Sequence, residues 1–215
     1  MTLSSPTTRL CLVRHGETDW NLAGRLQGQI DIPLNANGQR QAEQLARALQ
    51  QRGIRFDGCY CSDLGRASAT AAAVARRLEL ARQPAADLRE RHFGCFQGLT
   101  YDEAREQMPQ IYLRFKAREP DFAPSDGECL RSFYQRVGHF LGELVTRHPG
   151  QTLLIVSHGG VLDMAYRLAS GKPLQDARDF PIPNAALNWI SHDGDGWRLD
   201  SWADQTHLQN SLDEL

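Results

Sequence analysis

Residues 9–21, RLCLVRHGETDWN, begin as a short apolar strand and end in a dense cluster of polar and charged side chains. The apolar run at 9–13 is typical of a buried strand. The cluster that follows it comprises Arg14, His15, Glu17, Asp19 and Asn21. A turn from a strand into a helix needs only a glycine and a capping side chain. This density of ionisable groups therefore calls for a chemical explanation.

The same order of short strand and longer helix recurs along the chain. Residues 58–62 (GCYCS) and 152–157 (TLLIVS) are β-rich runs typical of buried parallel strands. Residues 35–53, with Asn35 as the predicted N-cap, and residues 65–80 carry apolar side chains at helical spacing. Strands that alternate with helices of this length predict an α/β fold, a three-layer α/β/α sandwich with a mainly parallel central sheet.

The second half of the chain adds two helices and a hairpin. The longest apolar stripe of helical period covers residues 130–145, and Ser125 and Glu128 have the spacing of a capping box at its start. A shorter helix is predicted at about 160–170. The runs ALNWIS (186–191) and WRLDSW (197–202), joined through HDGDG, predict a β-hairpin at the end of the sheet.

Residues 98–128 break this alternation. Their apolar residues lie at roughly helical spacing interrupted at Pro109, and a stretch rich in proline and acidic residues follows. We expect an insertion of one or two helices over an edge of the sheet. A chain of 215 residues is long enough for one well-buried core, so a single domain spanning 1–215 is predicted.

Composition and charge limit the partners. With a formal net charge of −2 the chain has no global positive field to attract nucleic acid or an anionic membrane. Any anionic ligand must therefore be held by local positive charge.

The five cysteines are odd in number and lack CxxC spacing, which favours reduced, mostly buried thiols. Because the sequence shows neither a signal-peptide pattern nor a membrane-spanning run, we expect a cytoplasmic protein.

A short motif that occurs twice in the chain indicates the functional site. VRHG at 13–16 and VSHG at 156–159 each place a histidine and a glycine directly after an apolar strand. Arg66 follows the strand at 58–62, and Glu90 follows a strand predicted near 85–89. Ligands of open parallel sheets bind at the carboxyl ends of the strands, so these side chains are expected to converge.

Two histidines, two arginines and one carboxylic acid suit phosphoryl transfer. Guanidinium groups match phosphate oxygens and stay charged throughout a catalytic cycle. A neutral imidazole can attack phosphorus, and a carboxylic acid can protonate the leaving alkoxide and then activate water. The sequence has no HExxH or HxH ligand pattern and no GxxxxGK[ST] loop, so neither a metal site nor another cofactor is predicted.

Four sequence blocks resemble those of one family, the histidine phosphatase superfamily, to which cofactor-dependent phosphoglycerate mutases belong. LVRHGETDWN (12–21) resembles its RHG signature, and CSDLGRASATA (61–71) resembles its S-D-L-x-R-A-x-x-T-A block. LRERHFGCFQG (88–98) resembles its L-x-E-x-x-F-G-x-x-E-G block, and VSHGG (156–160) its second His-Gly motif. The blocks occur in the family's order, and the resemblance implies a phosphoglycerate mutase-like fold.

The resemblance implies a role for each matched residue. His15 would be the nucleophile that accepts the phosphoryl group, and Glu90 would be the proton donor. Arg14, Arg66 and His158 would form the phosphate pocket.

The resemblance also implies a set of substrate-binding positions. Asn21 would hold the same phosphate, because it follows His15 at the family's spacing. Gln27 and Gly28 match positions that border the substrate, and Gly159 of the second His-Gly motif completes the predicted set.

Three functions remain open at this point. The first is a metal-independent phosphomonoesterase that hydrolyses small-molecule phosphate esters through phospho-His15. The second is a cofactor-dependent phosphoglycerate mutase, and the third is a non-catalytic phosphate-binding or scaffold protein. LQGQIDIPL (26–34) and the short 98–128 segment resemble the phosphatase branch more than the mutases. Two departures from the family pattern are Gln97, where many relatives have Glu, and Cys129 in GEC, where GES is common. No pattern assigns a particular substrate or an oligomeric state.

Overall fold

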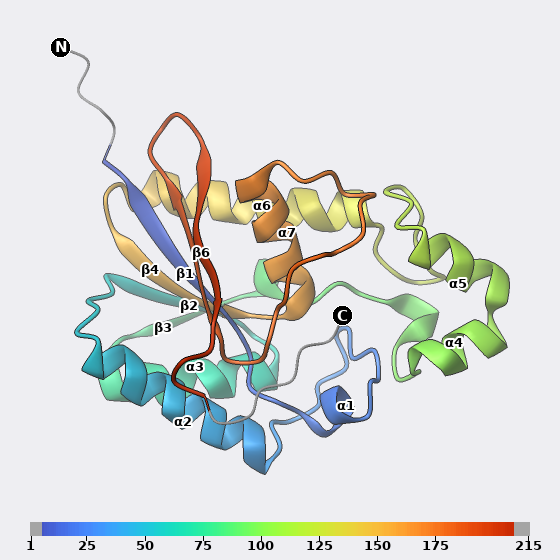
Figure 1. Cartoon of the computed structure of the whole chain (residues 1–215), viewed down its shortest axis with the longest axis horizontal. Coiled ribbons are helices and arrows are strands. Elements are labelled where there is room, and N and C mark those ends of the chain that lie inside the picture. The colour runs from blue at the N-terminus through green and yellow to red at the C-terminus, as the bar shows by residue number, and fades with distance from the viewer. Residues whose placement is uncertain (1–5, 209–215) are drawn as a thin grey trace.

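The computed structural model describes residues 6–208 and has a six-stranded mixed sheet at its centre (Figure 1). The strands lie in the order β3-β2-β4-β1-β5-β6. β1 to β4 pair in parallel, while β5 runs antiparallel to both β1 and β6. The bounds are β1 (Thr8–Arg14), β2 (Gly58–Ser62), β3 (Arg82–Ala85), β4 (Thr152–Ser157), β5 (Leu187–His192) and β6 (Trp197–Asp204). The predicted α/β class, with a mainly parallel sheet and a terminal hairpin, is confirmed.

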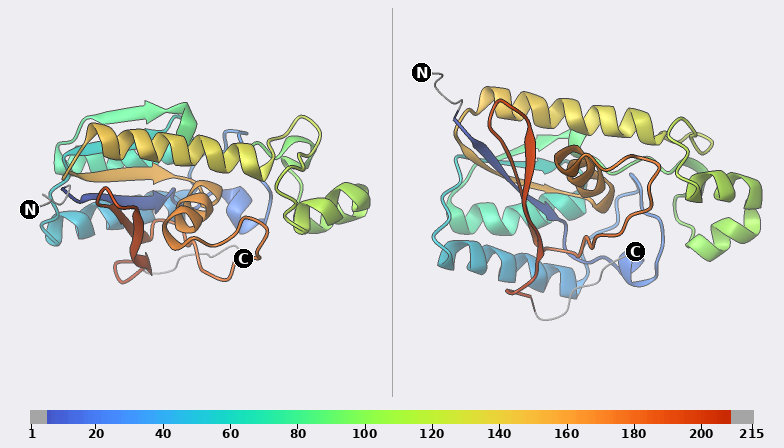
Figure 2. Two further views of the ribbon diagram at one scale, coloured as in Figure 1. Left: turned by 90° about the horizontal axis from the view of Figure 1, so that it is seen from above. Right: turned by 45° about the horizontal axis from the view of Figure 1, so that its top comes forward.

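Helices cover both faces of this sheet. Successive side chains of a strand point to opposite faces, so Leu10 and Leu12 of β1 enter one apolar core and Cys11 and Val13 the other. The first core packs against α6 and α7 and the second against α2 and α3 (Figures 1 and 2). The four helices are α2 (Ala36–Gln51), α3 (Gly65–Leu78), α6 (Leu130–Arg147) and α7 (Gly159–Ser170). Burial on both faces explains why the central strands β1 and β4 are continuously apolar, whereas the edge strands β3 and β6 are more exposed and more polar.

The start of α2 is as predicted. The Asn35 side chain accepts a hydrogen bond from the Gly38 N–H at 2.8 Å, which satisfies one of the free donors of the first turn. The helix then buries its apolar stripe, Ala42, Leu45, Ala46 and Leu49, against the sheet.

The capping box predicted at Ser125 and Glu128 is wrong. Cys129 is the N-cap of α6, and its Sγ accepts the Ser132 N–H at 3.4 Å. Ser125 lies in a turn before the helix, and the Glu128 carboxylate is bound by the Arg136 guanidinium. The apolar stripe itself is confirmed, with Leu130, Phe133, Val137, Phe140, Leu141 and Leu144 buried.

The strand predicted near 85–89 lies earlier in the chain. β3 ends at Ala85 and is followed by the 3₁₀ helix η1 (Ala86–Leu88). The Ser157 hydroxyl donates to the Leu88 carbonyl at 2.7 Å, and the Leu88 side chain is fully buried. This contact turns the chain inward, so Glu90 follows a 3₁₀ turn and not the strand itself.

Residues 98–128 contain two short helices, α4 (Tyr101–Gln107) and α5 (Pro109–Lys116). These helices lie beyond the carboxyl ends of the parallel strands and not over an edge of the sheet (Figure 1). The reason is a separate small core in which Leu26, Phe96 and Ala104 pack together, fixing the helices to the loops near 26 and 93–99. The remaining short elements are α1 (Asp19–Leu22) and η2 (Gly94–Phe96).

The five cysteines are all free, and those at 11, 59 and 61 are buried. Burial raises the pKa of the Cys59 thiol to about 12, which keeps it unreactive. Within residues 6–208, none of the helices combines the length and the apolar composition that crossing a membrane requires.

We expect Leu141→Ala to lower the free energy of unfolding by about 2–5 kcal/mol, because it leaves a cavity between α6 and the sheet. Leu113→Ala is the matched control, since Leu113 is 61% exposed on α5, and its effect should stay within about 0.5 kcal/mol. Urea denaturation of both variants measures the difference. Equal losses would contradict the assignment of the core.

Candidate active site

The pairing of β1 with β4 brings the two histidines together. Arg14 lies opposite Ser157 in the parallel register, and the His15 N–H donates to the Ser157 carbonyl at 2.8 Å. His15 and His158 are the next residues of the two strands, so they leave the sheet side by side. Their ring centroids are 5.2 Å apart at an interplanar angle of 61°.

The His15 ring is held in one tautomer and kept neutral. Its Nδ1 lies 2.7 Å from the Gly16 carbonyl, to which it donates, so Nε2 carries the lone pair. The Arg66 Nε–H points at Nε2 from 3.3 Å, in agreement with this tautomer. Burial lowers the pKa of His15 well below its usual range, and the positive charges of Arg66 and Arg14 lower it further.

Two arginines approach the same point from different elements. Arg66, in the first turn of α3, is 1% exposed and donates to the carbonyls of Gly28 and Ile30 at 2.7 and 2.8 Å. Arg14, at the end of β1, donates to the Ile182 carbonyl at 3.0 Å. These backbone contacts orient both guanidinium groups without neutralising their charge.

His158 is fully buried, and among the described residues neither of its ring nitrogens has a hydrogen-bond partner. Buried polar groups are rarely left unpaired, because each costs about 1–3 kcal/mol of desolvation. Burial is the main cause that lowers the pKa of His158, followed by the charge of Arg66. An unpaired polar ring beside two guanidinium groups indicates that a ligand completes the site.

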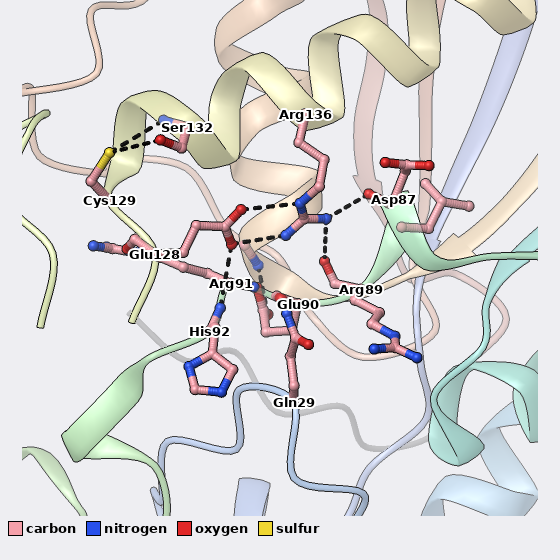
Figure 3. A network of polar contacts seen from close by, with 12 residues as sticks. Gln29, Asp87, Arg89, Glu90, Arg91, His92, Glu128, Cys129, Ser132 and Arg136 are labelled. Atoms are coloured by element: carbon pink, nitrogen blue, oxygen red, sulfur yellow. Dashed lines mark hydrogen bonds and ion pairs between the residues drawn. The ribbon is translucent and has the colours of Figure 1, made fainter. Parts of the chain in front are cut away.

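Glu90 is buried beside the start of α7. Its two oxygens accept the N–H groups of Arg91 at 2.7 Å and Gly160 at 2.9 Å. The Glu90 carbonyl also accepts from the Gln29 side chain at 3.1 Å (Figure 3). Burial raises the pKa of Glu90 above its ordinary value, although both N–H groups oppose the shift. The carboxyl group therefore holds its proton to a higher pH than an exposed glutamate does.

These groups open on a cavity of about 390 Å³. The residues of the predicted set that line it are Arg14, His15, Asn21, Gln27, Gly28, Arg66, Glu90 and Gly159. His158 does not line the cavity and lies against the His15 ring. The structure thus brings all nine predicted residues to one place.

The predicted substrate-binding residues are positioned by local backbone structure. The Asn21 Oδ1 accepts the Thr18 N–H at 3.1 Å, which orients the Asn21 amide. The Gln27 Oε1 is buried, has no hydrogen-bond partner within residues 6–208, and is another acceptor for a ligand. Gly28 has a φ of +54°, and a Cβ there would lie 2.1 Å from the Gln97 side chain, so the loop requires glycine.

Two residues that support the site are absent from the predicted set. Asn184 is fully buried and donates from Nδ2 to the His15 carbonyl at 2.7 Å. Gly160 gives its N–H to Glu90, and no side chain fits there. Gly160 was visible in the second His-Gly motif, whereas no local pattern marks Asn184.

No cation site accompanies this arrangement in the described part of the chain, 6–208, where no three His, Cys, Asp or Glu side chains are grouped to hold a metal ion. The cations that line the cavity are arginines and Lys116, beside the neutral His15 ring, and they suit an anion.

Comparison with known proteins places the chain in a family. The family model for the histidine phosphatase superfamily (branch 1) matches residues 10–205. The metal-independent phosphoserine phosphatase of Arabidopsis thaliana is 36% identical over 97% of this chain and 86% of its own length. Phosphoglycerate mutase-like protein 4 of the same plant is 35% identical over 94% and 87%. The solved mycobacterial glucosyl-3-phosphoglycerate phosphatase superposes with a TM-score of 0.81 at 30% identity, covering 92% of this chain and 99% of its own. The chain therefore belongs to the histidine phosphatase superfamily, as its four sequence blocks predicted.

Proposed function

We propose that this chain is a metal-independent phosphomonoesterase that hydrolyses small-molecule phosphate esters through a phosphohistidine on His15. The observation that carries the proposal is the neutral His15 ring, whose Nε2 lone pair lies beside two charged guanidinium groups. The predicted reaction class, a phosphoric monoester hydrolase of this superfamily, is confirmed by relatives named as phosphatases. The roles of individual residues are our assignment.

In the first step His15 Nε2 attacks phosphorus in line with the ester oxygen. The N–P bond forms as the P–O bond to the alcohol breaks, and Glu90 gives its proton to the departing alkoxide. Arg14, Arg66 and His158 bind the phosphoryl oxygens, where charge gathers in the loose transition state. Asn21 adds an amide donor from α1, and the backbone around Gly28 and Gly159 borders the ester.

In the second step water removes the phosphoryl group. The Glu90 carboxylate takes a proton from the water as its oxygen bonds to phosphorus, and the N–P bond breaks toward His15. His15 returns to its neutral form, and Glu90 is again protonated. The cycle ends with alcohol and inorganic phosphate and needs no metal ion or other cofactor.

The same first step would serve a phosphoglycerate mutase, which returns the phosphoryl group to bound substrate. Relatives carry names of both kinds, and those named as phosphatases favour the phosphatase. Incubation with 3-phosphoglycerate and 2,3-bisphosphoglycerate separates the phosphatase from the mutase activity, and isomerisation faster than phosphate release would identify a mutase.

We also propose that the whole chain is one domain, since the family model runs from β1, the first strand, to β6, the last.

His15→Ala should abolish the hydrolysis of p-nitrophenyl phosphate in the presence of EDTA, because it removes the attacking atom. A fall of at least about 10⁴-fold in kcat is expected for loss of a nucleophile. His139→Ala is the matched control, since the His139 side chain is 79% exposed on α6, and its activity should equal the wild type. Activity that disappears in EDTA in the unmodified protein would refute the metal-independent mechanism.

Glu90→Gln should slow esters of alkyl alcohols by about 10²–10⁴-fold, as expected for a lost general acid. Hydrolysis of p-nitrophenyl phosphate should suffer less, because its leaving group needs little protonation.

The same substitution also tests the pH dependence. Glu90 acts as an acid, and its pKa is raised, so wild-type kcat/KM for an alkyl ester should fall as the pH rises through that pKa. The depressed pKa of His15 keeps the nucleophile neutral down to well below pH 6.5. In Glu90→Gln the fall of kcat/KM at alkaline pH should disappear, while the dependence on the titration of the substrate phosphate should remain. An unchanged profile in this variant would exclude Glu90 as the acid.

Gly160→Ala should damage the site through Glu90. An added Cβ would lie 2.1 Å from the Glu90 Oε1 and 2.9 Å from the Phe133 ring, so the carboxyl group must move. Displacement on this scale is expected to reduce kcat/KM for alkyl esters by about 100-fold. Gly138→Ala on α6 meets nothing within 4 Å and should leave activity unchanged. Equal rates for both variants would contradict the described position of Glu90.

A further inference from the structure

Several cations that line the cavity have no part in the proposed phosphoryl transfer, and one of them, Arg91, is buried. Arg91 follows Glu90, lines the same cavity and is only 5% exposed. Its guanidinium lies 5.3 Å from the Phe115 ring and 6.0 Å from the Phe93 ring, which positions it by cation–π contact. The phosphate cradle of Arg14 and Arg66 is built without it.

Arg91 has no carboxylate partner within residues 6–208. Its Nε donates to the backbone carbonyl of Glu128 at 2.8 Å, not to the Glu128 carboxylate. That carboxylate is bound instead by Arg136 at 2.9 and 3.0 Å and by the His92 N–H (Figure 3). Within the described residues Arg91 therefore carries a buried positive charge without a direct ion pair, and only the more distant carboxylates of Glu128 and Glu90 favour that charge.

Burial is the main cost of this charge. It lowers the pKa of Arg91 to about 10 with a contribution from the nearby Arg118, while Glu128 opposes the shift, and the group stays charged at neutral pH. Arg118 also lines the cavity and is paired with Asp163 at 2.9 Å, whereas Arg91 has no such pair. A buried charge without a counterion is unfavourable, and a bound anion would relieve the cost.

We propose that Arg91 is a specificity residue that binds a second anionic group, a carboxylate or a second phosphate, on the alcohol part of the substrate. The inference rests on the proposed phosphatase function and names its substrate class: small phosphate monoesters that carry a further negative charge. Phe93 and Phe115 hold the guanidinium in position, and Arg91 lines the cavity. A planar fork of donors matches either anion, so the two kinds of ester must be compared directly.

The test compares O-phosphoserine with O-phosphoethanolamine, which lacks only the carboxylate, by phosphate release in EDTA. The wild-type protein should prefer O-phosphoserine in kcat/KM, and Arg91→Met should reduce this preference by about 10–100-fold, as expected for a lost hydrogen bond to a charged group. Arg91→Lys keeps the charge and should retain part of the preference. Arg89→Met is the matched control, because Arg89 pairs with Asp63 outside the cavity, and it should keep the full preference.

A parallel pair, fructose 1,6-bisphosphate and fructose 6-phosphate, shows whether the second anion is a phosphate. If the wild-type protein prefers the ester with the second anionic group in one pair only, and Arg91→Met loses that preference, the pair identifies which anion Arg91 selects. A thermal melt followed by circular dichroism, compared with the wild-type protein, shows whether Arg91→Met is folded.

Two outcomes would overturn the inference. The first is equal kcat/KM values within both pairs for the wild-type protein. The second is an equal fall in kcat/KM in Arg91→Met for the esters with and without the second anionic group. Failure of the phosphatase proposal is a separate result, because the wild-type protein would then not release phosphate from any ester, p-nitrophenyl phosphate included.

Discussion

The site depends on the parallel register between β1 and β4, in which Arg14 lies opposite Ser157. A shift of one residue would turn the alternate side chains of a strand to the other face, and both apolar cores would lose their partners. Burial of the two faces therefore fixes the register, and the register sets His15 beside His158. The polar cluster is thus positioned by apolar packing along the whole length of the two strands, not by contacts within the cluster.

The charges around His15 serve the chemistry at some cost to the fold. Two guanidinium groups and a second imidazole surround a buried ring, so protonation of that ring is strongly disfavoured. The same positive charges attract the phosphate dianion that the neutral ring attacks. The pKa of Glu90 is shifted in the opposite direction, since burial keeps its carboxyl group protonated to a higher pH. Surroundings that raise the pKa of an acid and lower the pKa of a nucleophile are typical of active sites.

Much of the fold and the site followed from short sequence patterns, because an apolar strand and the polar residues after it are contiguous in the chain. The ends of parallel strands meet at one edge, so topology alone brought such residues together. Contacts between distant segments were not predictable in this way. Asn184 reaches His15 from the loop before β5, and no local pattern marks it. The false capping box had correct spacing, but spacing does not reveal that Arg136 binds Glu128. Arg91 belongs to a charged run whose ordinary interpretation is a solvated surface, and only its burial against two aromatic rings sets it apart.

The most direct test of the account is to trap the covalent intermediate. The protein is mixed with an excess of a phosphate ester and quenched in alkali within one turnover, because phosphohistidine is stable to base, and its peptides are then analysed by mass spectrometry. We expect a phosphoryl group on His15, in the tryptic peptide that begins after Arg14, and we expect it to form no more slowly than phosphate is released. Phosphate release without any phosphorylated histidine, or a phosphoryl group on His158 instead, would contradict it.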